Sequence, residues 1–340
     1  ISRTYKIMPY TQVANLDFNQ IKASLKEYMR AQSDFTDYDF EGSTLSVLLD
    51  TLAYNTYYTA FNTNMVVNEL FIDSATLRDN VVALAKQLGY RPKSATSPTA
   101  YISFTVTYTN ATTDTELLLK KGTGFTATYD NNIYNYVVLD DVKAQVANGV
   151  ATFTDVAVNE GTQLTNTFVV NSASKSQRFI LDNKSIDTNT IRVKVYPTGG
   201  SFNEPYLVAD NILGVDGTSK VFFLDEIEDE RYEILMGDGV LGKKLENNAR
   251  IEVSYLITSG PESNGVRTFV FSGVLENPNN VSPNSFSVTI NSTVAAAGGE
   301  EIESTQKIKY TAPKAYGTQE RAVTADDYEA IVRKVYPATS

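Results

Sequence analysis

The sequence contains no cysteine and no histidine. Without cysteine the chain cannot form a disulfide, a thiol nucleophile or a thiolate metal site. Without histidine it lacks the commonest zinc ligand at neutral pH, the usual general base and every catalytic arrangement that pairs histidine with serine or cysteine. Most enzyme mechanisms are therefore disfavoured, and we expect no catalytic residue, no metal site and no cofactor.

Long apolar runs and basic clusters are also absent. No run approaches the ~20 apolar residues of a membrane-spanning helix, and the first residues carry no apolar secretory segment. The net charge is −11, whereas duplex nucleic acid and anionic membranes both require a basic surface. We expect a soluble protein whose partners are neither nucleic acid nor membrane.

The residues that are present predict an α+β protein. Hydrophobic residues make up 42% of the 340-residue chain and aromatic residues 11%, which excludes global disorder and provides for two or more units. The order of the patterns predicts a helical domain at 1–98, a mainly antiparallel β-rich domain at 99–297, and a linker with a C-terminal helical segment at 298–340.

Apolar residues in the first domain recur at steps of three and four, which is typical of amphipathic helices. Capping residues place the helix starts. The sequence predicts one helix after Asn15 or Asp17, a second after Ser43 or Thr44 that ends near Met65, and a third from about Ser74 to a C-terminal Gly89.

The second of these helices carries an aromatic stripe: Tyr54, Tyr57, Tyr58, Phe61 and Met65. One interpretation is that the stripe packs a three-helix core. The other is that it binds a partner, because three short helices cannot enclose so wide an apolar surface. We expect Tyr57, Phe61 and Met65 to pack on the first and third helices and Tyr54 and Tyr58 to remain partly exposed.

From Thr99 the pattern changes to the alternation of apolar and polar residues that is typical of strands, and short strands recur as far as about Val294. Asn148-Gly149 between two such runs predicts a type I′ hairpin. Later, Ala295–Gly299 reads as a flexible joint, and Thr324 with Asp327 predicts the start of a last helix.

A glycine-rich connection joins two strands in the middle of this region. Gly237, Asp238, Gly239 and Gly242 match the spacing of a dinucleotide-binding loop, but that loop must open a helix, and here another strand follows. We expect these glycines to supply positive φ angles in a turn or bulge.

One dense acidic run provides an alternative hypothesis, a glycosidase or a cation site. Glycoside hydrolysis needs two carboxylates at a fixed separation across a cleft, which neighbours in sequence do not supply, and the spacing of a calcium-binding loop is absent. A solvated loop is the simpler interpretation. The run comprises Asp225, Glu226, Glu228, Asp229, Glu230 and Glu233.

Several short motifs together resemble a known family. The motifs are the Gly237-Asp238-Gly239 turn, a Glu160-Gly161 turn, Asp187–Thr190 leading into a strand, Ala312-Pro313, and Arg321–Thr324 followed by Asp327-Tyr328. In order and in letters, they resemble baseplate J-like proteins and the baseplate wedge subunits of T-even-type contractile-tailed phages.

This resemblance implies a structural virion protein of the tail baseplate, assembled in the host cytoplasm. The expected partners are other wedge subunits, including a second copy of the chain, neighbouring wedges in a ring, the central hub and sheath-proximal proteins. Members of the family continue past the Asp-Tyr helix into a region used for dimerisation, whereas this chain stops at Ser340. The alternative function is a carbohydrate-binding tail fibre or adhesin, suggested by the 21 tyrosines.

Overall fold

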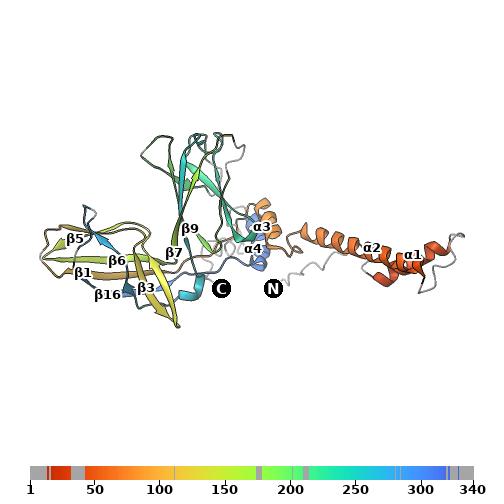
Figure 1. Cartoon of the computed structure of the whole chain (residues 1–340), viewed down its shortest axis with the longest axis horizontal. Helices are drawn as coiled ribbons and strands as arrows, with labels where there is room; N and C mark the ends of the chain where they lie inside the picture. Colours follow the sequence, from red (N-terminus) through yellow and green to blue (C-terminus); the bar gives the residue numbers. More distant parts are fainter. Residues whose placement is uncertain are drawn as a thin grey trace. The chain divides into compact units, whose positions relative to one another are not determined.

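The computed structural model describes residues 14, 17–31, 43–110, 112–173, 178–200, 202–209, 214–279, 281–283, 285–318, 321 and 328 (Figure 1). The chain forms two compact units, one of residues 1–92 and 304–340 and the other of residues 93–303. In the described part of the chain, helices α1 to α4 lie in the first unit and two β-sheets in the second, so the α+β class is confirmed.

The first three helices begin and end close to the predicted capping residues. They are α1 (Phe18–Arg30), α2 (Thr44–Glu69) and α3 (Arg78–Gln87). Asp17 caps α1 by accepting hydrogen bonds from the N–H groups of Asn19 and Gln20, and the Ser43 hydroxyl accepts from the N–H of Ser46 at 3.0 Å. Gly89 follows α3 with a φ of +76°, as expected of a C-terminal glycine.

Helix α3 starts four residues later than predicted, and a carboxylate from α2 holds the turn that leads into it. Glu69 accepts hydrogen bonds from the N–H groups of Thr76 and Leu77 and from the Asn80 side chain at 2.8 Å. Ser74 lies in the preceding turn, where its hydroxyl donates to the Asn68 carbonyl. Partial burial of Glu69 opposes its ionisation, but these hydrogen bonds outweigh burial and lower the pKa of Glu69.

The C-terminal helix does not form a separate segment. Helix α4 (Thr305–Thr318) packs on α3, where Ile308 and Ala312 share a buried cluster with Val81, Val82 and Ala85. The prediction placed residues 298–340 apart because the two helices are separated by the whole β unit in sequence. Their apolar faces nevertheless form one core.

The first sheet of the β unit is antiparallel and has nine strands among the described residues. One path through it runs β16-β1-β6-β4-β3-β14, and β5, β2 and β15 branch from β6. A phenylalanine core lies inside, where Phe104 stacks on Phe153 with ring centroids 4.7 Å apart. The strands are β1 (Thr99–Tyr108), β2 (Glu116–Leu119), β3 (Gly124–Tyr129), β4 (Asn132–Val137), β5 (Val142–Ala147), β6 (Val150–Glu160), β14 (Val270–Phe271), β15 (Leu275–Glu276) and β16 (Phe286–Ala297).

The second sheet has the order β7-β13-β9-β10-β11-β12-β8. All its pairs are antiparallel except β10 with β11. Its core includes Ile234, Ile251 and Val253, which are fully buried. The strands are β7 (Thr162–Val169), β8 (Arg178–Leu181), β9 (Ile186–Tyr196), β10 (Glu204–Val208), β11 (Val221–Glu226), β12 (Tyr232–Met236) and β13 (Arg250–Ile257).

Buried carboxylates tie the segments where the two sheets meet. Asp187 accepts hydrogen bonds from the N–H and the hydroxyl of Ser97, at 2.9 and 2.7 Å. Glu160 accepts from the Thr258 hydroxyl at 2.6 Å and from the Ser259 N–H at 3.0 Å. Because both carboxylates are buried, these charge-assisted bonds fix the connecting segments strongly.

The predicted flexible joint at Ala295–Gly299 is wrong. Its three alanines continue β16, and Ala296 is buried. The N–H of Gly299 donates to the Asn264 side chain at 3.0 Å, and the Gly299 carbonyl accepts from the same amide at 2.9 Å. A Cβ at Gly299 would lie 2.4 Å from Pro98, so this glycine serves close packing.

Candidate assembly surface on the second helix

Helix α1 covers only one face of α2. The Asn64 amide on α2 exchanges two hydrogen bonds with the backbone of Ala14, both 3.0 Å long. Further along, Lys22 on α1 pairs with Asp50 on α2 at 2.5 Å. The two helices are therefore antiparallel, as Figure 1 shows. The buried face of α2 presents Ser46, Leu49, Ala53, Ala60, Asn64 and Asn68.

A second face of α2 carries large apolar side chains that no described residue buries. We call it the α2 stripe: Val47, Tyr54, Tyr58, Phe61 and Met65, each between 47% and 59% exposed. The members are seven, four, three and four residues apart, which keeps them on one line of a helix. The stripe is therefore continuous over most of α2.

The structure corrects part of the sequence prediction for this helix. Tyr54 and Tyr58 are exposed as predicted, and Tyr57 is half-buried. Phe61 and Met65 were expected to pack on the other helices, but about half of each side chain is exposed. The reason is that α1 docks on the small side chains of the opposite face, and sequence periodicity alone does not tell which apolar face a neighbour covers.

The threonine hydroxyls beside the stripe are hydrogen-bonded within the helix and do not depend on water. Their hydroxyls donate to the carbonyl four residues earlier, with distances between 2.8 and 2.9 Å. Such back-bonding satisfies the hydroxyl inside the helix and leaves the methyl group to the surface. A partner covering the stripe would thus bury few unsatisfied polar groups. These residues are Thr51, Thr56, Thr59 and Thr63.

The geometry of the α2 stripe suits a binding surface. The Tyr54 and Tyr58 rings lie 5.5 Å apart with an interplanar angle of 49°, so they form one aromatic platform. Tyrosines of this kind bury a large area with little loss of rotamer entropy. The spacing of about 3.5 residues is the one at which a second helix packs its side chains into the seam.

In the glycine-rich loop between β12 and β13, the predicted positive φ angles occur at two of the three glycines, and Gly237 is the exception, because its lack of a Cβ serves close packing on Gly242 instead. Gly239 and Gly242 have φ angles of +97° and +87°. The Gly239 N–H donates to the Gly242 carbonyl at 3.0 Å, and Asp238 accepts from the N–H groups of Leu241 and Val240, which lower the pKa of Asp238. No helix follows before β13, so the loop lacks the helix N-terminus of a phosphate site.

The acidic run covers the end of β11, the connection that follows and the start of β12. Glu233 is buried and ion-paired with Arg178 on the neighbouring strand β8. Asp229 and Glu230 form a tight turn with φ angles of 62° and 61°. The carboxylates therefore follow one hairpin instead of facing each other across a cleft. Among the described residues, no three acidic side chains gather to hold a metal ion.

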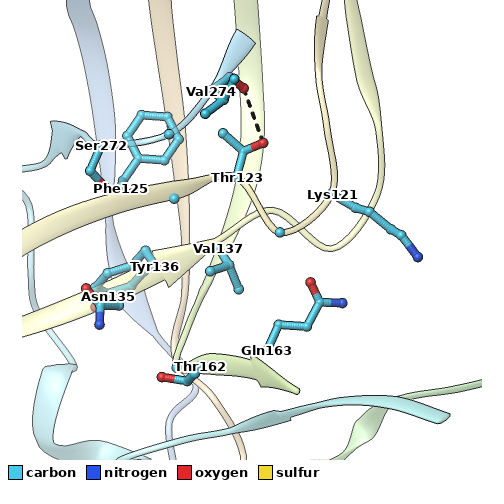
Figure 2. A pocket seen from close by; sticks show the side chains of 14 residues that line it. Lys121, Thr123, Phe125, Asn135, Tyr136, Val137, Thr162, Gln163, Ser272 and Val274 are labelled. Atoms are coloured by element: carbon cyan, nitrogen blue, oxygen red, sulfur yellow. Dashed lines mark hydrogen bonds between the residues drawn. The ribbon is translucent and has the colours of Figure 1, made fainter. Parts of the chain in front are cut away.

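A cavity of about 550 Å³ lies in the β unit (Figure 2). Thr123, Gln163, Asn135 and Lys121 are among its lining residues. Burial raises the pKa of Tyr136 to about 12, and its hydroxyl lies 2.9 Å from the Ser263 hydroxyl. With no acid and base in contact, the cavity offers no catalytic arrangement.

Of the C-terminal motif residues, Arg321 and Tyr328 are described and Asp327 lies outside the described residues. The Arg321 N–H donates to the Thr318 carbonyl at 2.8 Å, just past α4, and the Tyr328 side chain is exposed. The predicted cap at Thr324 also lies outside the described residues. None of the described helices is both long and apolar enough to cross a membrane.

Comparison with known proteins gives three similarities. Residues 17–90 match the family described as baseplate wedge protein gp6-like, helical domain. The chain is 30% identical to the baseplate wedge protein gp6 of Enterobacteria phage T4, over 98% of the chain and 52% of that relative. It thus spans about half of the relative's length.

The third similarity is to a chain in the cryo-EM structure of the anti-feeding prophage baseplate, at 14% identity and a TM-score of 0.30, over 98% of this chain and 66% of that one. A TM-score this low does not support a shared fold. The sequence similarities support the class of a structural protein of the phage tail baseplate, located in the virion. Within that class they support a baseplate wedge protein.

Proposed function

We propose that this chain is a structural wedge subunit of a contractile phage tail baseplate, without enzymatic activity. Its helical unit binds other wedge subunits, including a second copy of the chain. Its β unit forms part of the inner ring around the central hub, in contact with neighbouring wedges and sheath-proximal proteins. The similarity over 98% of the chain to a T4 wedge protein supports this proposal.

The observation that carries the binding role is the exposed α2 stripe. Five large apolar side chains on one line of one helix are unusual on a surface that has no partner. The stripe also lies inside the part of the chain that matches the wedge helical domain. In the alternative function, a carbohydrate-binding fibre or adhesin, the aromatic residues would line β-loops, whereas here the aromatic platform is helical.

Truncation of the two stripe tyrosines tests the proposal. Tyr54→Ser with Tyr58→Ser should leave the chain folded by circular dichroism, because both side chains are more than half exposed. Truncating a binding anchor commonly costs about 2 kcal/mol or more, which corresponds to roughly a 30-fold loss of affinity per tyrosine. Co-purification with the other wedge subunits should therefore fall sharply.

A matched control removes two exposed tyrosines elsewhere. Tyr101 on β1 and Tyr316 on α4 are 46% and 57% exposed, so Tyr101→Ser with Tyr316→Ser changes the same chemistry away from the stripe. This control should assemble normally. Unfolding of the stripe variant would show that the stripe is core, and normal assembly would show that the two tyrosines are not anchors.

A further inference from the structure

The first sheet curls until its two end strands approach each other without pairing. Phe271 on β14 stacks on Phe104 of β1 with centroids 6.2 Å apart, and meets Phe125 of β3 at 5.3 Å. Phe104 in turn lies opposite Ile290 of β16 in the β1–β16 ladder. Strands β14 and β16, the ends of the path through the sheet, thus border one core.

A cavity of about 610 Å³ lies between these two ends. We call it the open seam; its lining residues are Phe269, Val270, Phe271, Phe286, Val288, Thr289 and Ile290. Along β16, the half-buried Phe286, Val288 and Ile290 alternate with exposed Ser287 and Thr289. The volume is within the ~300–1,000 Å³ of typical ligand sites. Six of the seven lining residues have apolar side chains, and polar atoms make up a comparable part of the lining surface.

The backbone at the seam is also unpaired. Among the described residues, β16 pairs with β1 alone and β14 with β3 alone. At its far end the outer edge of β16 does take a partner, because the N–H of Ala296 donates to Val266 and the Ala296 carbonyl accepts from Gly265. The chain then leaves β16 on its way to β14. Alternate residues of an antiparallel strand point their N–H and C=O groups away from the partner strand. Every second residue of the edge from Phe286 to Ile290 therefore keeps a free N–H and C=O group.

We propose that the open seam accepts one extended strand of another polypeptide, with apolar residues at alternate positions, which pairs antiparallel with β16. The partial charges of the free edge are complementary to an extended backbone, whereas a helix satisfies its own backbone groups and a small apolar molecule has none to offer. Alternate side chains of that strand enter the apolar lining. A curled sheet of a second copy cannot enter a space bounded on both sides by strands, so the occupant is a lone segment.

Amide hydrogen exchange on the full chain tests this proposal. The probe is a blocked peptide of about nine residues, with alternating threonine and valine and a lysine at each end. At about 1 mM probe, exchange at residues 286–290 should slow about tenfold. A second peptide with prolines at two threonine positions lacks the N–H donors and should give no protection.

Two variants locate the binding. Val270 lines the seam and is 63% exposed, so Val270→Lys should fold normally and abolish the protection. Val240, in the loop after β12 and 73% exposed, provides the control Val240→Lys, which should retain it. The proposal is overturned if the threonine-valine peptide gives no protection, if Val270→Lys keeps it, or if residues 286–290 already exchange as slowly as β1 in the free chain. Self-association that Val270→Lys abolishes would make a second copy the occupant and also overturn it.

Discussion

Replacing Gly237 by alanine should destabilise the β unit more than a substitution at any positive-φ glycine that lies in open space. A Cβ at Gly237 would lie 2.2 Å from the carbonyl carbon of Gly242 and 2.4 Å from its oxygen. Both clashing atoms belong to the backbone, so no side chain can rotate away. The loop itself must move.

The magnitude follows from what that movement breaks. Two backbone hydrogen bonds hold Gly242, one from the Gly239 N–H to its carbonyl and one from its N–H to the Asp216 carbonyl, each 3.0 Å. Each contributes about 0.5–1.5 kcal/mol net, and forced overpacking adds about 1–3 kcal/mol. We expect Gly237→Ala to lower the free energy of unfolding by about 2–6 kcal/mol.

Urea unfolding followed by circular dichroism measures this loss, and amide exchange in β12 and β13 assigns it to the loop. Gly149→Ala is the reference, because Gly149 has a φ of +74° and nothing within 4 Å of its Cβ; it should cost only about 1 kcal/mol of backbone strain. The reasoning is refuted if Gly237→Ala is as stable as the unmodified chain, or no less stable than Gly149→Ala.

Four further predictions concern the glycine-rich loop, the Glu69 hydrogen bonds before α3, the ion pair of Arg178 with Glu233, and enzymatic activity. Gly239→Val should lower the free energy of unfolding by about 1–3 kcal/mol, because the φ of Gly239 is +97°. Neither NAD nor ATP should shift the melting temperature of the unmodified chain. Glu69→Gln should lower the free energy of unfolding by about 1 kcal/mol at pH 7. The folded pKa of Glu69 is lowered, so the stability that its carboxylate contributes is present above pH 4.5 and is lost as the pH falls through the folded pKa. Urea titrations of the variant and the unmodified chain should show this difference. Arg178→Ala should lower the free energy of unfolding because it leaves the buried Glu233 carboxylate unpaired, and adding Glu233→Gln should recover part of the loss in a double-mutant cycle. Zymograms on peptidoglycan or polysaccharide should show no cleared zone, and one that appears would contradict a purely structural role.

Local signals made much of the fold predictable. Asn148 and Gly149 both have positive φ in the predicted hairpin, with values of 54° and 74°. Asp17 and Ser43 cap the helices that they were expected to cap. These features depend on residues within four positions of each other, and there the physics of capping and turns decides the structure.

Features set by distant contacts could not be predicted. Helix α4 packs on α3, which precedes the whole β unit in sequence. Glu69 bonds to Thr76 across a turn that the periodicity of the helices does not show. The exposure of Phe61 and Met65 depends on which face of α2 its neighbour covers. The open seam arises from the curl of a whole sheet, and no stretch of sequence encodes that by itself.

The points where the chain enters and leaves the β unit are fastened to each other. Two hydrogen bonds join Lys93 and Glu303: the Glu303 N–H donates to the Lys93 carbonyl, and the Lys93 N–H donates to the Glu303 carboxylate, each at 3.0 Å. Thr96 pairs with Glu300 beside them. Mechanically, these hydrogen bonds bear a load in place of the strands of the β unit. A pull applied between residues 93 and 303 therefore loads these hydrogen bonds before it stretches the strands between them.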